Sequence, residues 1–253
     1  MPLVDLSAPV EPSPDDALEA LRVDIDYSDH AAGAKQIEQL FGLPARLLRN
    51  GEGWANDEFR RFGTHSSTHV DAPWHYNSTI RGEPAMRIDE LPLEWFFSDG
   101  VVLDMTGRED GEVVDRADVE LELERIGHEL KPLDIVLIST GRDEFYGQLD
   151  YMARGTGVTA EATRWLYDCG VRVMGIDAWG WDRPLHIQAA EALESDEPGV
   201  FWEAHQCELQ YSQIERLVNL AALPPTGFRV ACFPLRIVGG SAAPARVVAI
   251  VED

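Results

Sequence analysis

The sequence predicts an α/β fold built on a mixed β-sheet. Three observations support this prediction: continuous apolar and β-branched segments typical of buried strands, helical segments that alternate with them, and two more strand patterns near the C-terminus. At 253 residues the chain can bury a large core. Since no break in composition separates these segments, we expect one principal domain.

Residues 3–60 differ from the rest of the chain because they are polar, acidic and rich in loops. Residues 34–40 predict only a short helix. Four prolines interrupt any longer element, namely Pro9, Pro12, Pro14 and Pro44. We therefore expect residues 1–60 to form an N-terminal arm or lid, and residues 61–253 to form the main domain.

From Gly100 the chain alternates between strand and helix patterns. Residues 101–105 (Val-Val-Leu-Asp-Met) predict a buried strand, and residues 118–130 predict an amphipathic helix. Residues 134–140 are almost continuously apolar and β-branched, which indicates a strand buried on both faces. A strand followed by a helix and another strand is typical of α/β units.

A second helix is predicted over residues 159–169. Thr159 can cap its first turn, the Glu161 carboxylate faces the positive end of the helix dipole, and Gly170 can end the helix. Residues 171–177 then predict another short strand.

The last third of the chain predicts one helix and two strands. We expect the helix over residues 212–220, and the strands over residues 228–238 and 245–251, joined through Gly239 and Gly240. These tail strands make the expected sheet a mixed one.

Charge and composition exclude several classes of partner. The chain has 21 lysines and arginines against 45 aspartates and glutamates, so its net charge is −24. Such a charge repels nucleic acid and anionic membranes, and we expect neither as a partner. The odd number of cysteines, Cys169, Cys207 and Cys232, leaves at least one free thiol. With no signal-peptide pattern and no long apolar run, we expect a cytoplasmic protein.

Three of the seven histidines lie within eleven residues, beside an aspartate. In an extended segment, His65, His69 and Asp71 project to the same side. Pro73 then turns the chain, so that His75 can approach them. Neutral imidazoles and a carboxylate are ligands for Zn²⁺ or Mn²⁺. The cluster therefore predicts a metal site. The isolated histidines carry no predicted chemistry; they are His30, His128 and His186.

The segment from His65 to His75, His-Ser-Ser-Thr-His-Val-Asp-Ala-Pro-Trp-His, resembles the H-x-G-T-H-x-D-x-P-x-H motif of the metal-dependent cyclase-like hydrolases. This family contains bacterial kynurenine formamidase and isatin hydrolase. The resemblance extends to residues 4–7, 134–141, 170–177, 233–237 and 244–250. It implies a single α/β domain with a mixed sheet, of the swivelling β/β/α type. Ser67 stands where the motif has glycine, which affects any conformation that depends on glycine.

The resemblance implies two more metal ligands. Family members of the formamidase type add a histidine and a glutamate from the C-terminal half, and the matching residues here are His205 and Glu215. The interval between them is slightly shorter than in the family pattern, so Glu203 and Glu208 remain alternatives. One or two ions, Zn or Mn, are expected, with Asp71 bridging if there are two.

A bound divalent metal makes hydroxide available at neutral pH, and an imidazole can then move the proton. His75 is the expected proton shuttle, a role that the resemblance also implies. Thr68 or Ser67 can orient the ligands. The aromatic residues expected to contact the substrate are Trp74, Tyr76, Trp179 and Trp181. Asp177, at a strand end, is expected to cap a turn.

These residues predict a metal-dependent hydrolase that cleaves a C–N bond of a small aryl formamide, lactam or related amide. Two alternatives stay open. One is a metal-dependent cyclase or dehydratase acting on polyketide-like carbonyl compounds, and the other is a metal-binding protein without catalytic activity. We also expect a small-molecule substrate and a homo-oligomer, a dimer or a tetramer.

Overall fold

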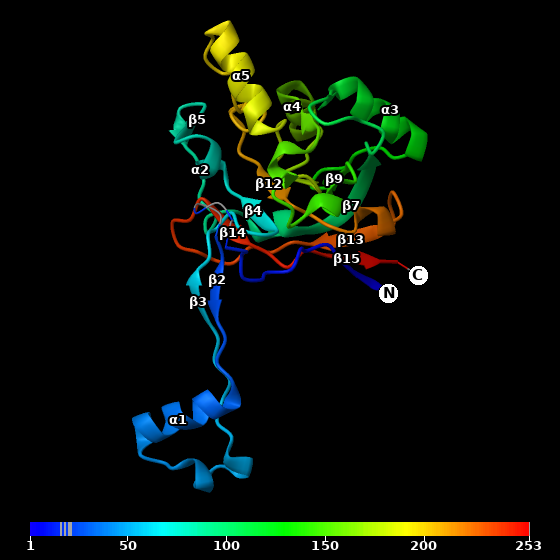
Figure 1. The fold of residues 1–253 in the computed structure, drawn as a ribbon. Helices are drawn as coiled ribbons and strands as arrows, with labels where there is room; N and C mark the ends of the chain where they lie inside the picture. Colours follow the sequence, from blue (N-terminus) through cyan, green and yellow to red (C-terminus); the bar gives the residue numbers. More distant parts are fainter. Residues whose placement is uncertain (16, 18, 20–21, 253) are drawn as a thin grey trace. The chain divides into compact units, whose positions relative to one another are not determined.

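The computed structural model describes residues 1–15, 17, 19 and 22–252, and it divides the chain into two compact units (Figure 1). The main unit comprises Met1–Pro9 and Ser67–Asp253, and the small unit comprises Val10–Ser66. The predicted arm of residues 1–60 therefore shares residues 10–60 with the small unit, whereas its first nine residues belong to the main unit.

The main unit is built on one mixed sheet of nine strands among the described residues. Four central strands run parallel to one another, and antiparallel strands extend the sheet on both sides. The strands, in sheet order, are β1 (Leu3–Asp5), β15 (Val248–Val251), β13 (Phe228–Ala231), β7 (Phe97–Asp104), β9 (Ile135–Ser139), β11 (Val173–Ile176), β12 (Ser212–Glu215), β4 (His69–Asp71) and β14 (Ala242–Pro244). The predicted α/β fold with a mixed sheet is confirmed.

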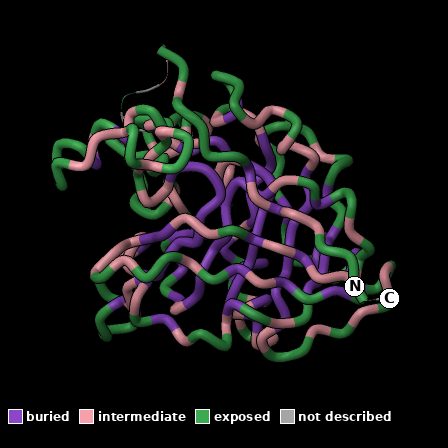
Figure 2. Tube along the Cα trace, turned by 90° about the horizontal axis from the view of Figure 1, so that it is seen from below, coloured by how far each residue is buried: buried purple, intermediate pink, exposed green. Residues whose placement is uncertain are grey.

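Helices α3 (Arg116–Ile126), α4 (Ala160–Asp168) and α5 (Leu185–Ser195) lie on one side of this sheet (Figure 1). Side chains alternate along the central strands, because successive residues of a strand point to opposite faces. Val136 and Ile138 pack into the core beneath α3 and α4, whereas Ile135 and Leu137 pack into a second core on the opposite face. Figure 2 shows the buried residues gathered in the interior, with exposed residues around them.

The predicted cap of α4 is confirmed, since the Thr159 side chain accepts a hydrogen bond from the amide of Ala162. The remaining elements are short. In the main unit they are α2 (Pro73–Tyr76), β5 (Thr79–Ile80), β6 (Glu83–Pro84), η4 (Leu93–Phe96), β8 (Val113–Val114), η5 (Arg142–Phe145), η6 (Tyr151–Ala153), β10 (Gly157–Val158) and η7 (Leu220–Ala222).

The small unit contains a helix and a two-stranded sheet. Helix α1 (His30–Phe41) is capped by Asp29, whose side chain accepts a hydrogen bond from the Ala32 amide. Strands β2 (Asp24–Asp26) and β3 (Glu58–Arg61) pair antiparallel, and the two 3₁₀ helices are η2 (Ala45–Leu47) and η3 (Arg49–Gly51). The short helix predicted over residues 34–40 lies within α1. No helix among the described residues combines the length and apolarity needed to cross a bilayer.

Three local predictions are wrong. Residues 212–220 do not form a helix, because Ser212–Glu215 is strand β12, inserted between β11 and β4. The strand predicted over residues 228–238 ends at Ala231. The extended segment predicted from residue 65 to residue 71 is limited to β4, since Ser67 has a φ of 55°, in the left-handed region.

Candidate metal centre

The centre of the site is a cross-strand pair. In the antiparallel register of β12 and β4, Glu215 lies opposite His69, and Asp71 projects from the same face of β4. Directly opposed residues of antiparallel strands have their Cβ atoms roughly 5 Å apart. The sheet register therefore brings together a histidine and a glutamate that are far apart in the sequence.

The three side chains converge on one point. His69 Nε2 lies 3.3 Å from Asp71 Oδ1 and 3.5 Å from Glu215 Oε2. All three residues are buried, and their ligand atoms lie within 4.8 Å of one another. His69 Nδ1 is 2.9 Å from the carbonyl oxygen of Ser67. A proton on Nδ1 would be donated to that carbonyl, which leaves the lone pair of Nε2 directed at the two carboxylates.

The loop before β4 is fixed by hydrogen bonds within the main unit. The Ser67 hydroxyl donates to the Ala8 carbonyl at 3.1 Å. The Thr68 hydroxyl donates to the Arg216 carbonyl at 2.6 Å and accepts from the Ala8 amide at 2.9 Å. Ser67 adopts the left-handed conformation that glycine favours, so the departure from the family motif keeps a backbone conformation that glycine would provide.

His65 belongs to the small unit, two residues before the main unit resumes at Ser67. It lies in a turn in which the Ser66 amide donates to the Gly63 carbonyl at 3.0 Å. Because the strand does not extend back to this residue, the predicted alternation does not apply to it. Its role as a ligand stays a prediction.

His75 lies at the edge of the cluster, on α2. Pro73 occupies the first turn of this short helix, and the His75 amide donates to the Ala72 carbonyl at 2.8 Å. His75 Nε2 is 3.9 Å from Asp71 Oδ2, and 23% of the side chain is exposed. His75 is thus the more accessible imidazole, whereas His69 is fully buried.

His205 approaches the cluster from the other side of Glu215. Its Nε2 lies 3.4 Å from Glu215 Oε1, and its Nδ1 lies 2.5 Å from Asp182 Oδ2. The Asp182 carboxylate also accepts hydrogen bonds from the amides of Ala204 and His205. Asp182 therefore orients the imidazole so that Nε2 points at Glu215. This aspartate was not predicted from the sequence, where no spacing links it to His205.

The charges of the site shift two pKa values. Burial acts to lower the pKa of His205, but the carboxylates of Asp182 and Glu215 outweigh it and raise the pKa to about 10. Burial and the Asp71 carboxylate act to raise the pKa of Glu215. The hydrogen bond from His205 and the charges of His205 and His69 lower that pKa below its usual value. Glu215 is therefore an anion inside the protein.

Trp202 is a second residue that the sequence did not single out as part of the site. Its ring stacks on His205 at 4.6 Å with an interplanar angle of 9°, and it meets the His75 ring edge-on at 5.0 Å. Its φ is 65°, which is unusual for a bulky residue, and its amide donates to Gln188. No local sequence pattern predicts that Trp202 stacks on His205, because the position of its ring depends on the loop that precedes His205.

The four predicted substrate contacts divide into two groups. Trp74 and Trp179 are half-buried, so their rings can meet a ligand. The Tyr76 ring is buried against His205 and Tyr211. The Trp181 indole is fully buried and donates to Thr163, and its contact with substrate stays a prediction. Its backbone amide instead donates to Glu215 Oε1 at 3.0 Å.

The remaining candidates lie outside the cluster. Glu203 and Glu208 are exposed, so Glu215 is the carboxylate that joins His205. Asp177 caps a turn, as predicted: it accepts hydrogen bonds from the Thr140 amide, the Thr140 hydroxyl and the Gly141 amide. Burial raises its pKa to about 6, although these hydrogen bonds act to lower it.

The donor set fits a divalent transition metal. It consists of imidazole nitrogens and carboxylate oxygens, which Zn²⁺ and Mn²⁺ both accept, and no thiol is part of the set. Two imidazoles have a hydrogen-bond partner on Nδ1, which leaves Nε2 to face the carboxylates. The partner of His69 is the Ser67 carbonyl, and the partner of His205 is the Asp182 carboxylate. Such partners are typical of metal-binding histidines.

Known proteins resemble this chain in sequence and in fold. The family model described as "Putative cyclase" matches residues 4–183. A kynurenine formamidase from Salinibacter ruber is 29% identical over 196 residues, covering 74% of this chain and 76% of that protein. Isatin hydrolase A from Ralstonia solanacearum has a similar structure, with a TM-score of 0.75, 24% identity, and coverage of 99% of this chain and 92% of that chain.

Another solved structure, described as a potential metal-dependent hydrolase with cyclase activity, has a TM-score of 0.65 and 20% identity. It covers 100% of this chain and 98% of that chain, so the likeness in fold extends over the full length. The family match covers well over half of the residues. The chain therefore belongs to the putative cyclase family.

Proposed function

We propose that this protein is a metal-dependent hydrolase that cleaves a C–N bond of a small aryl formamide, lactam or related amide. The observation that carries the proposal is the buried convergence of His69, Asp71 and Glu215 on one point. The names of two relatives, a kynurenine formamidase and an isatin hydrolase, support amide bonds as the target.

Five residues are proposed to hold one or two Zn or Mn ions. They are His65, His69, Asp71, His205 and Glu215. Both oxygens of each carboxylate face a histidine: Asp71 lies between His69 and His75, and Glu215 lies between His69 and His205. When bound, a divalent ion lowers the pKa of a coordinated water to about 7 and polarises a carbonyl oxygen.

His75 is proposed to move the proton. It is the accessible imidazole of the cluster, and the nearby Asp71 carboxylate can stabilise its protonated form. Its Nε2 would take the proton from water and return it to the leaving nitrogen. Overall, the acyl carbon gains the oxygen of water, the C–N bond breaks, and the nitrogen leaves as an amine. Trp74 and Trp179 are proposed to contact the substrate, and Trp202 lies against both His75 and His205.

The test combines metal analysis with an assay of the purified protein. Formanilide is incubated with the isolated protein, with chelator-treated protein and with treated protein to which Zn²⁺ or Mn²⁺ has been restored. We expect turnover that follows metal content. A variant with His75→Asn should keep its metal but lose turnover. Hydrolysis by fully metal-free protein would refute the proposal.

Product mass separates this reaction from the cyclase alternative, because hydrolysis adds water whereas cyclodehydration removes it. The alternative of a metal-binding protein without catalytic activity predicts that His75→Asn lowers thermal stability and that neither the variant nor the wild-type protein shows metal-dependent turnover. The proposed homo-oligomer, a dimer or a tetramer, is tested by gel filtration.

A further inference from the structure

Arg216 is the one lysine or arginine that is buried within the described part of the chain, with 7% of its surface exposed. Basic side chains are rarely buried unless they are paired with an anion. Among the described residues, Trp179 supplies both the hydrogen-bond partner and the aromatic partner of this guanidinium. Its Nε donates to the Trp179 carbonyl at 3.4 Å, and its Cζ lies 4.8 Å from the centre of the Trp179 ring. Neither group carries a negative charge.

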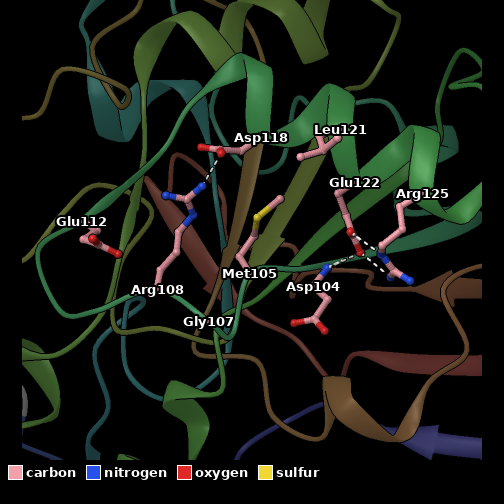
Figure 3. A pocket seen from close by; sticks show the side chains of 9 residues that line it. All are labelled: Asp104, Met105, Gly107, Arg108, Glu112, Asp118, Leu121, Glu122 and Arg125. Atoms are coloured by element: carbon pink, nitrogen blue, oxygen red, sulfur yellow. Dashed lines mark hydrogen bonds and ion pairs between the residues drawn. The ribbon is translucent and has the colours of Figure 1, made fainter.

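Several half-exposed arginines of the main unit have carboxylate partners. In the pocket beside the end of β7, Arg108 pairs with Asp118, and Arg125 donates to both oxygens of Glu122 (Figure 3). Carboxylates are abundant in a chain with a net charge of −24. Arg172 and Arg87 also lack such a partner but are less buried, so Arg216 is distinguished by being the buried arginine of the described residues.

Arg216 also lies next to the candidate metal centre. It follows Glu215 directly, and both residues are bound to the same loop, residues 178–181. The Arg216 amide donates to the Ala178 carbonyl at 3.1 Å, and Glu215 Oε1 accepts from the Trp181 amide at 3.0 Å. Trp179 lies in the chain between Ala178 and Trp181, and the Arg216 guanidinium lies over its ring.

The backbone of Arg216 is held in an unusual conformation. Its φ is 59°, in the left-handed region, which is unfavourable for a residue with a side chain. Its carbonyl accepts from Thr68 at 2.6 Å. The residue retains 7% exposure, and its two terminal nitrogens have no hydrogen-bond partner among the described residues.

We propose that Arg216 and the Trp179 ring form a subsite for a carboxylate, adjacent to the metal centre, which binds an acid group of the amide substrate. This inference rests on the proposed hydrolase function and names its substrate class, an amide that also carries a carboxylate. The planar guanidinium can donate two parallel hydrogen bonds to a carboxylate. A monoanion is favoured over a dianion because Asp71 and Glu215 lie nearby.

The experiment uses matched pairs of small aromatic molecules. The binding probes are the ortho, meta and para aminobenzoates and the corresponding neutral aminobenzamides, measured by calorimetry on the metal-loaded protein. The ortho, meta and para formamidobenzoates and formamidobenzamides are the matching substrates. All three isomers are included because they place the acid group at different distances from the nitrogen.

Two variants of Arg216 are compared with a control. Arg216→Asn removes the charge while keeping a residue that tolerates the left-handed region, and Arg216→Lys keeps the charge. Arg229→Gln is the control, because Arg229 is exposed on β13 against Phe97, and its loss changes the net charge equally. Thermal unfolding confirms that each variant is folded.

We expect at least one aminobenzoate to bind more tightly than its amide. Arg216→Asn should reduce that preference by about 10- to 100-fold, as for the loss of a hydrogen bond to a charged group. Arg216→Lys should keep part of the preference, and Arg229→Gln should keep all of it. In the hydrolysis of the formamidobenzoates, Arg216→Asn should mainly raise KM.

Three results would overturn the inference: no aminobenzoate binds, acids and amides bind wild type equally, or Arg216→Asn weakens both to the same extent. Failure of the proposed function gives a different result. In that case no formamide is hydrolysed, although aminobenzoates still bind in a manner that depends on Arg216.

Discussion

Replacing Asp182 by asparagine is expected to weaken metal binding without unfolding the protein. Three donors converge on the Asp182 carboxylate: the amide of Ala204 at 2.9 Å, the amide of His205 at 3.0 Å, and His205 Nδ1 at 2.5 Å. Only 8% of this side chain is exposed, so water cannot readily replace a lost acceptor. A carboxamide offers one acceptor oxygen where the carboxylate offers two.

Either orientation of the new amide harms His205 as a ligand. If the amide NH₂ faces the imidazole, Nδ1 must accept, which places the proton on Nε2 and removes the lone pair directed at the metal. If the amide oxygen faces the imidazole, the negative charge that makes the ring basic is lost, and the Ala204 amide has no acceptor.

The magnitude follows from these contacts. Loss of such a partner typically lowers metal affinity by about 10- to 100-fold, which is about 1.4–2.7 kcal/mol. One buried donor left without an acceptor costs about 1–3 kcal/mol of folding free energy. At about 2–4 °C per kcal/mol, the melting temperature should fall by several degrees.

Competition of the metal-free protein with a chromophoric chelator for Zn²⁺ or Mn²⁺ measures the affinity. Asp134→Asn is the matched control. Asp134 is also buried, accepts from His128 Nε2 at 2.9 Å and from the Lys131 amide, and precedes β9 at the opposite end of the parallel strands from Glu215. The Asp134→Asn variant should be less stable than the wild-type protein but should bind the metal with the same affinity. Wild-type affinity in the Asp182 variant, or an equal loss in both variants, would refute the reasoning.

Three further predictions follow from single contacts. Glu215→Gln should lower metal affinity by at least about 100-fold, since it replaces a proposed ligand, whereas Glu203→Gln, on an exposed side chain, should not. Equal affinities of the two variants in the chelator competition would contradict the assignment. Burial raises the pKa of Asp177 to about 6, above its unfolded value of about 3.9, so its carboxyl favours folding below pH 4 and this contribution is lost as the pH rises through 6. Its ¹³C carboxyl signal, assigned with Asp177→Asn, should titrate near pH 6, and a midpoint below 4.5 would count against this. Gly100→Ala should destabilise the protein by about 1–3 kcal/mol, because the added Cβ would lie 2.1 Å from the Phe228 ring, whereas Gly107→Ala meets open space; identical melting temperatures would contradict the packing.

Local patterns in the sequence determined the regular core of the fold. The strands β7, β9 and β11 and the capped helix α4 were predicted because alternating or continuous apolar residues and cap residues act over a few neighbouring positions. The pairing of His69 with Asp71 on one face of a strand has the same origin, since it depends only on two-residue periodicity. The fold class and this half of the site were therefore accessible from the sequence.

The family resemblance points to His205 and Glu215, but only the tertiary structure decides where they lie. Ser212–Glu215 is a strand and not the predicted helix, because pairing with β11 and β4 buries all four residues. That register places Glu215 opposite His69, and the loops that follow place Asp182 and Trp202 around His205. The longest of these contacts, between His69 and Glu215, joins residues 146 positions apart. Their formation depends on the packing of the whole sheet, which no local periodicity encodes.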